Sequence, residues 1–238
     1  MLCNTILSTY NLATIFDLFI HMFQSQAAPA KMLFKSAFSK WHFVLFESEN
    51  FVAIPSAGAL VEGWLLILPK QFHISIGSIG WDKVQELREF INRVKKNIES
   101  LYGSVLVFEH GPAILSRPVG CSIDYAHLHI VPFEQGIFSL TKEMFPYIKW
   151  SPAEDFEKCM EYHRRQEDYL YLDDPFEGSF IASSQHIPSQ LFRKVIAMKL
   201  NIAEMYDWRL YPEEHKIRAA VERISAANMV SSTCLKAT

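Results

Sequence analysis

The segment from 124 to 133, Asp-Tyr-Ala-His-Leu-His-Ile-Val-Pro-Phe, constrains the fold of this chain more than any other part of the sequence. Polar or aromatic residues alternate in it with apolar ones, and a two-residue period is that of a β-strand. One face of the predicted strand carries a phenol and two imidazoles, from Tyr125, His127 and His129. The residues between them are small or aliphatic and form an opposite, apolar face. We therefore expect a strand whose apolar face packs on a core and whose other face presents chemistry.

The sequence before this segment predicts the rest of a sheet and one long helix. Short strands are expected at 43–48 and 51–55, a buried strand at 64–68 (WLLIL), and another at 104–108, which Glu109-His110-Gly111 ends. A helix is expected to begin near Asp82, with apolar residues at helical spacing at positions 84, 87, 90, 91, 94 and 98. Together these elements predict an α+β fold with an antiparallel sheet of about five strands.

Three regions of different texture divide the chain. Residues 1–40 contain an apolar run at 12–23, which fits an amphipathic segment that packs on the domain, or a signal peptide. The run is too short to span a bilayer. Residues 41–136 form the predicted core. Residues 137–238 are expected to be a mostly helical extension that completes the same domain, with one short strand-like aromatic stretch beginning at Tyr169.

Composition excludes several classes of protein. The formal net charge of −3 argues against a protein that coats nucleic acid through a basic surface, although it permits a single phosphate ester in a small site. The four cysteines are widely spaced and form no C-x-x-C motif, so a disulfide framework or a zinc finger is not expected. Free thiols in a reducing cytoplasm are the simplest interpretation.

The His-x-His pair can support phosphoryl chemistry. One imidazole can attack phosphorus while the other donates a hydrogen bond to a non-bridging oxygen. The nucleophile must then be neutral, with an acceptor for its second ring proton. The same pair could instead bind zinc, with a third ligand from Glu109, His110 or Asp124, but no spacing selects one of these three.

The motifs around the pair resemble those of the histidine-triad (HIT) superfamily. Residues 120–131 (GCSIDYAHLHIV) look like the family signature, in which three histidines alternate with apolar residues. Upstream, 47–55, 58–63 and 66–70 follow the N-terminal half of the family in order, and 108–111 (FEHG) looks like its strand end. The resemblance covers roughly residues 43 to 133. It implies a HIT-like sheet and a homodimer.

The resemblance also implies roles for individual residues. His127 matches the nucleophile, His129 the phosphate-binding histidine and Ser122 the serine near the leaving group. The positions that line the nucleoside site in the family are Phe51, Ile54 and Leu66. Further substrate contacts are expected from residues that can bind phosphate or lie beside these motifs, namely Lys70, His110, Arg117, Gln190 and Arg193. Each of these five could equally be an ordinary structural residue.

Two positions depart from the family pattern. Tyr125 stands where the first histidine of the triad is expected, and Phe72 occupies the place of a histidine that usually follows Pro-Lys, with His73 next to it. A tyrosine hydroxyl can form a hydrogen bond but cannot be protonated at neutral pH. We therefore expect Tyr125 to alter the proton relay at the leaving group, as in a specialised transferase or an enzyme with a changed leaving group.

The sequence thus predicts a cytoplasmic enzyme that acts on a small-molecule nucleotide through a nucleotidyl-His127 intermediate. The reaction is hydrolysis or nucleotidyl transfer. No resident cofactor or metal site is expected, although a divalent metal ion can accompany the substrate phosphate, and neither nucleic acid nor a membrane is an expected partner. The alternative is a non-catalytic nucleotide-binding module whose triad has decayed at Tyr125.

Overall fold

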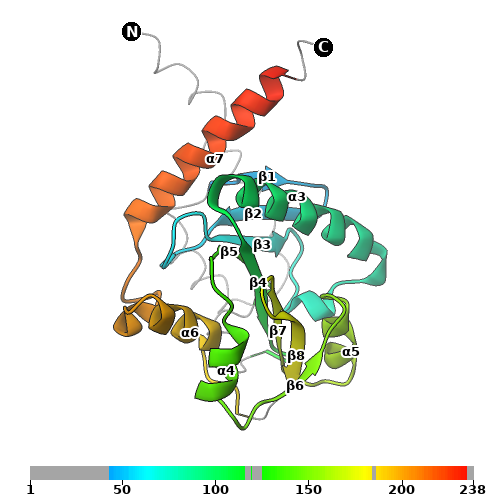
Figure 1. Cartoon of the computed structure of the whole chain (residues 1–238). Coiled ribbons are helices and arrows are strands. Elements are labelled where there is room, and N and C mark those ends of the chain that lie inside the picture. The colour runs from blue at the N-terminus through cyan, green and yellow to red at the C-terminus, as the bar shows by residue number, and fades with distance from the viewer. Residues whose placement is uncertain (1–42, 116–118, 120–124, 184–185, 235–238) are drawn as a thin grey trace.

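The computed structural model describes residues 43–115, 119, 125–183 and 186–234 (Figure 1). Within them, eight strands form one antiparallel sheet in the order β1-β2-β3-β5-β4-β7-β8-β6. The strands are β1 (Phe46–Glu47), β2 (Phe51–Pro55), β3 (Leu65–Pro69), β4 (Val105–Gly111), β5 (Leu128–Pro132), β6 (Lys149–Pro152), β7 (Tyr169–Asp174) and β8 (Gly178–Ser183). The fold is α+β, as the sequence predicts.

The helices of the described residues lie on both sides of this sheet. The α-helices are α3 (Val84–Tyr102), α4 (Phe138–Met144), α5 (Lys158–Arg164), α6 (Leu191–Lys199) and α7 (Glu214–Cys234). Short 3-10 helices are η1 (Ile76–Ser78), η2 (Trp81–Lys83) and η4 (Ala203–Tyr206). None of the described helices is both long enough and apolar enough to cross a membrane. The segment expected at residues 1–40 lies outside the described residues.

The expected sheet of about five strands was too small, because the region after Gly136 adds three strands to it. β7 pairs with β4, β8 with β7, and β6 with β8. β7 is built from the Tyr-Leu-Tyr-Leu stretch, in which bulky residues point to both sides: Tyr169 and Tyr171 pack on one face, and Leu170 and Leu172 on the other. The extension therefore adds strands as well as helices, and it is continuous with the core through hydrogen bonds between strands.

The expected end of the fourth strand at Glu109 was also wrong. β4 continues through Gly111, because Glu109, His110 and Gly111 all pair with β7. A strand partner gives these residues the backbone hydrogen bonds that an edge strand would leave open. The consequence for the site is direct, since His110 lies within a central strand and its side chain direction is fixed by the pleat.

Each face of the sheet has its own apolar layer. The first layer joins α3, α5 and part of α7 to the sheet, and α3 contributes the apolar residues expected from helical spacing: Val84, Leu87, Phe90, Ile91, Val94 and Ile98. The second layer joins α4 and α6 to the opposite face. A third, smaller cluster contains Val52, Ile54, Leu66, Leu68 and Tyr125. Alternation along β4 and β5 places the histidines on the side of α6.

Candidate active site

Strands β4 and β5, with the residue just before β5, bring three histidines together. His129 on β5 pairs with Leu66 on β3 on one side and with Phe108 on β4 on the other. His127 lies two residues before His129, and His110 lies two residues after Phe108, so all these side chains leave the sheet on one face. The ring centroids of His127 and His129 are 5.0 Å apart, and those of His110 and His129 are 6.4 Å apart.

The proton of His127 is placed by the backbone. Its Nδ1 lies 2.7 Å from the carbonyl oxygen of Tyr125. A carbonyl oxygen can only accept, so Nδ1 must carry the proton and Nε2 keeps its lone pair. No described residue binds Nε2. Burial lowers the pKa of His127, while the bond to Tyr125 raises it, and the net shift is downward from 6.5. A neutral imidazole with a free Nε2 is what nucleophilic attack requires.

His129 has the opposite tautomer. The indole Nε1 of Trp64 donates to its Nδ1 at 3.0 Å, so the ring proton must lie on Nε2. The His129 ring also stacks on Phe108, with centroids 4.4 Å apart and planes inclined by 22°. Burial lowers the pKa of His129 well below 6.5, and the neighbouring imidazoles and Arg193 lower it further. The side chain is therefore a neutral donor through Nε2.

His110 is a third imidazole on the same face. It is 1% exposed, and within the described part of the chain neither of its ring nitrogens has a hydrogen-bond partner. Its ring packs against Phe108 and, with centroids 5.0 Å apart, against Phe192 of α6. Burial, with a smaller contribution from His127, lowers the pKa of His110 to about 3. An unpaired polar group in such a place is costly, which singles out His110 as a group that a ligand could satisfy.

The hydroxyl of Tyr125 is directed at the backbone instead of at a leaving group. It donates to the carbonyl oxygen of Pro69 at 2.6 Å, and burial raises its pKa. The Tyr125 ring meets Phe72 edge to face, with centroids 5.7 Å apart. The two positions that depart from the family pattern thus touch each other, and together they form an aromatic pair where two histidines are expected.

The residues expected around the nucleoside fall on different faces. Ile54 and Leu66 belong to the small cluster with Tyr125, on the same side as the histidines. Phe51 lies on the opposite side, where it stacks on Phe90 of α3 with centroids 6.2 Å apart. The period of β2 separates it from Ile54, so the two side chains do not line one surface. Lys70 pairs with Glu47, at 2.5 Å, near the β1 edge of the sheet.

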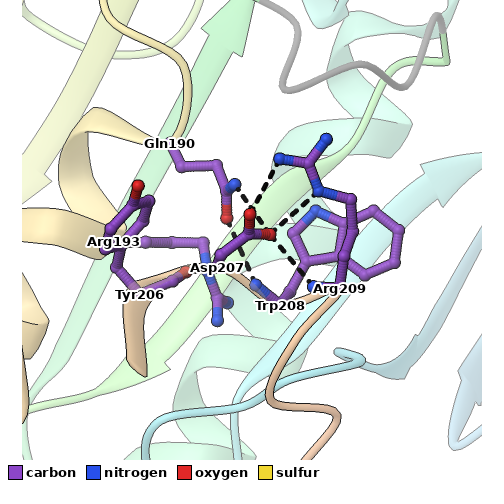
Figure 2. Close-up of polar contacts among 6 residues, drawn as sticks. All are labelled: Gln190, Arg193, Tyr206, Asp207, Trp208 and Arg209. Carbon is purple, nitrogen blue, oxygen red and sulfur yellow. Dashed lines mark hydrogen bonds and ion pairs between the residues drawn. The ribbon is translucent and has the colours of Figure 1, made fainter. Parts of the chain in front are cut away.

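Gln190 and Arg193 belong to a polar network of the extension, shown in Figure 2. Gln190 donates through Nε2 to Asp207, at 3.2 Å, and its Oε1 accepts from the backbone N–H of Trp208. The guanidinium of Arg193 donates to the carbonyl oxygens of Tyr206 and Gly58, at 2.8 Å and 2.5 Å. Both side chains are therefore engaged with the protein, and a role in binding substrate stays a prediction.

The remaining expected positions cannot be placed. Ser122 and Arg117 lie outside the described residues, as does Asp124, one of the three residues considered as a third zinc ligand. In the described part of the chain, no group of three His, Cys, Asp or Glu side chains is arranged to hold a metal ion.

Sequence reasoning missed two aromatic residues that position His129. Trp64 was expected only to begin a buried strand, and Phe108 only to end one. A partial signal was present, because each lies two residues from an expected site residue on its strand, Trp64 from Leu66 and Phe108 from His110. The hydrogen bond between Trp64 and His129 has no signal in the sequence, since it depends on β3 and β5 being neighbours.

The sequence matches no protein-family model and no curated protein. Solved structures similar to the chain include a hypothetical histidine triad nucleotide-binding protein from Sulfolobus tokodaii, at 20% identity and a TM-score of 0.35, which covers 44% of this chain and 70% of its own. The match to a HIT-like protein involved in cell-cycle regulation from Bartonella henselae covers 57% of this chain and 95% of that protein, at 15% identity and a TM-score of 0.36. The match to a HIT family hydrolase from Legionella pneumophila covers 45% of this chain and 96% of that protein, at 24% identity and a TM-score of 0.34. These proteins belong to the family that the sequence resembles, and at such values the likeness carries no argument about activity.

Proposed function

We propose that this protein cleaves a phosphoanhydride or phosphoester bond of a nucleotide through a covalent nucleotidyl-His127 intermediate. The observation that carries the proposal is the 2.7 Å bond from Nδ1 of His127 to the carbonyl of Tyr125, which leaves Nε2 as a neutral nucleophile. His129 and His110 add two further imidazoles to the face that we propose binds the phosphate.

The chemistry balances in two steps. Nε2 of His127 forms a bond to phosphorus while the bond from phosphorus to the leaving oxygen breaks, and that oxygen keeps the electron pair. Water or another hydroxyl acceptor then attacks phosphorus and loses its proton, and the P–N bond returns its electron pair to Nε2. In both steps the Nε2–H of His129 donates to a non-bridging oxygen, where negative charge develops.

Other side chains near His127 and His129 are assigned supporting roles in this proposal. Ile54 and Leu66 are assigned to the nucleoside, since they lie on the histidine side of the sheet. His110 is assigned to a phosphate oxygen, because its nitrogens have no hydrogen-bond partner among the described residues. Phe51 is given no part, as it packs under α3 on the opposite face.

The test is a panel of nucleotides read by intact-protein mass spectrometry. The panel contains nucleoside triphosphates, dinucleoside polyphosphates, nucleotide sugars and a nucleoside phosphoramidate. The wild type should gain the mass of one nucleotide on acid-free quenching, and His127→Ala should gain none. His215→Ala is the control, because its side chain is 76% exposed on α7. An adduct of equal yield in His127→Ala would overturn the assignment.

A second candidate function is nucleotide binding without turnover. It is favoured by the hydroxyl of Tyr125, which is bound to Pro69 and so leaves the first triad position without a group directed at the leaving oxygen. Saturable binding of a nucleotide by calorimetry, with no adduct and no product over the whole panel, would select this function over the first.

A further inference from the structure

The indole N–H of Trp64 forms a hydrogen bond with a histidine of the candidate site. Its side chain is 1% exposed, and its indole Nε1–H donates to Nδ1 of His129 at 3.0 Å. An indole N–H has no acceptor capacity, so this contact can form only when Nδ1 of His129 is unprotonated. The neutral ring then has its proton on Nε2. A cationic His129 would place two donors against each other.

The extension holds Trp64 in place through Arg193. The guanidinium carbon of Arg193 lies 4.9 Å from the centroid of the Trp64 ring, over its face. The same guanidinium donates to the carbonyls of Tyr206 and Gly58. Gly58 belongs to the loop that leads into Trp64, and the N–H of Ser56 donates to the Trp64 carbonyl across that loop. Arg193 thus ties the loop, the indole and the extension together.

Gly58 allows the loop before Trp64 to approach the extension closely. It has φ +66, and a Cβ there would lie 2.6 Å from the backbone of Trp208. Its N–H donates to the carbonyl of Pro212 at 2.9 Å. The segment from Tyr206 to Pro212 is therefore packed directly on the loop before Trp64, and Figure 2 shows the polar network that orders it. The indole itself is contacted by Arg193 of α6, His129 of β5 and Phe108 of β4.

We propose that Trp64, held by Arg193 of the C-terminal extension, is a positioning residue that fixes His129 as an Nε2–H donor to the substrate phosphate. The role in binding phosphate rests on the proposed function, whereas the tautomer does not. The extension thereby acts on the reaction without touching substrate, which gives residues 188–212 a part in the site beyond completing the fold.

The surroundings of His129 agree with a neutral ring. Among the described residues, the titratable or charged groups that act on it are His127 just before β5, His110 on β4 and Arg193 on α6, and none of these three is acidic. Among the described residues, the hydrogen-bond partner that orients His129 is a donor to Nδ1. Trp64 supplies that donor from β3's N-terminal end, and Phe108 supplies the stacking surface.

The test reads the tautomer directly, with no substrate present. Long-range 1H–15N correlation spectra of ¹⁵N-histidine-labelled protein distinguish Nδ1–H, Nε2–H and cationic rings. In the wild type, His129 should be a single Nε2–H tautomer at pH 8 and should stay neutral well below pH 6.5. In Trp64→Phe the single tautomer should be lost, because Nδ1 is then free to carry the ring proton.

Trp150→Phe is the matched control. It is the same substitution within the apolar layer of α6, and the Trp150 indole Nε1 has no hydrogen-bond partner among the described residues. His129 should keep its tautomer in that variant. Arg193→Met should give a mixture of tautomers, since the indole loses the group that lies over it.

The outcomes separate the two proposals. A wild-type His129 that carries its proton on Nδ1, or that titrates near 6.5, overturns the inference even if Trp64→Phe does not fold. An unchanged tautomer in folded Trp64→Phe also overturns it, and an unchanged tautomer in Arg193→Met removes Arg193 from it. Absence of any nucleotide adduct on the wild type sinks the proposed function and leaves the tautomer result standing.

Discussion

Single hydrogen bonds decide what each imidazole of the site can do. His127 and His129 are two residues apart, His129 on β5 and His127 just before it, and are equally buried. Yet the carbonyl of Tyr125 makes His127 an acceptor through Nε2, and the indole of Trp64 makes His129 a donor through Nε2. A nucleophile and an oxyanion donor result from identical side chains. This division of labour needs no charged partner, since burial keeps both rings neutral.

Tyr125→Phe separates the hydroxyl of this residue from its carbonyl. The hydroxyl donates to Pro69, so its loss should lower the free energy of unfolding by about 1 kcal/mol. The rate of adduct formation should stay within about twofold of wild type, because the carbonyl that binds His127 remains. Urea denaturation and the mass-spectrometric adduct assay measure the two effects.

Tyr171→Phe serves as control for this variant, since it makes the same change on the opposite face of the sheet. A folded Tyr125→Phe with an adduct rate lowered a hundredfold would mean that the hydroxyl takes part in the reaction. In that case the aromatic pair with Phe72 would be a catalytic device and not a filled space.

Glu109 makes the stability of the fold depend on pH. It is 1% exposed on the face opposite the histidines, where Tyr169 donates to Oε2 and the N–H of Ile76 donates to Oε1. Burial raises its pKa from 4.5 to about 8, although these two bonds oppose the shift. Between those values the folded state binds more protons than the unfolded state, so the contribution of Glu109 to stability falls as pH rises from 4.5 to 8.

Glu109→Gln should remove that dependence. Relative to wild type, the variant should gain stability between pH 5 and pH 8, at up to about 1.4 kcal/mol per pH unit. The buried imidazoles act in the opposite sense below pH 6.5, so the difference between the two proteins isolates the carboxyl. Urea midpoints across pH measure it, with the exposed Glu134→Gln as control. Parallel curves for wild type and Glu109→Gln would contradict the assignment.

The sequence predicted the site as far as local geometry reaches. Alternation in the strand places His127 and His129 on one face, and the resemblance adds His110 and Leu66 to the same region. The resemblance assigned Phe51 and Ile54 to one surface, whereas their spacing of three along a strand puts them on opposite faces. The sequence could not identify Trp64 as a partner of His129, because strand order is a long-range property.

At the level of elements, the predicted strands and the long helix are those with strong periodicity. The buried run at β3 and the helical spacing of α3 are both present. β6 and β8 escaped prediction for a physical reason: β6 is short and exposed, and β8 is mostly small or polar, so neither has the apolar pattern of a buried strand. β8 is a strand because it pairs with β7, and β6 because it pairs with β8.

The junction of β4 and β7 depends on a glycine. A Cβ at Gly111 would lie 2.0 Å from Cζ of Tyr169, its partner across the ladder. Tyr169 is fully buried and hydrogen-bonded to Glu109, so it cannot move aside cheaply. Gly111→Ala should therefore lower the free energy of unfolding by about 3 kcal/mol.

Gly80→Ala is the matched control for Gly111→Ala. Its φ of −65° suits alanine, and the Cβ would meet only the flexible carboxylate tip of the exposed Asp82. Its cost should be below about 0.5 kcal/mol by thermal or urea denaturation. Equal losses in the two variants would show that Tyr169 is free to shift and that this junction is not tightly packed.

At the scale of the molecule, the extension and the predicted core are one structure. The sheet runs without interruption from β1 to β6 through β4 and β7. The apolar layer on the histidine side contains Phe108 from the core and Phe192 from α6, with ring centroids 4.8 Å apart. A homodimer, expected from the resemblance, stays a prediction.

Because one sheet and one layer include both regions, residues 43–234 should unfold in one transition. Amides of β3 and β8 report on the two halves, and hydrogen exchange read by mass spectrometry in rising urea should show both losing protection at the same concentration. Leu172→Ala, a change at a fully buried residue of β7, should lower the free energy of unfolding reported by both strands by about 2–5 kcal/mol, so that both lose protection at the same lower urea concentration. Phe176→Ala, at a half-exposed side chain in the β7–β8 turn, should change the free energy of unfolding reported by either strand by less than about 0.5 kcal/mol. Loss of protection in β8 while β3 stays protected would mean that the extension is a separate unit, and the bridge from Arg193 to His129 would then be a contact between units that can open.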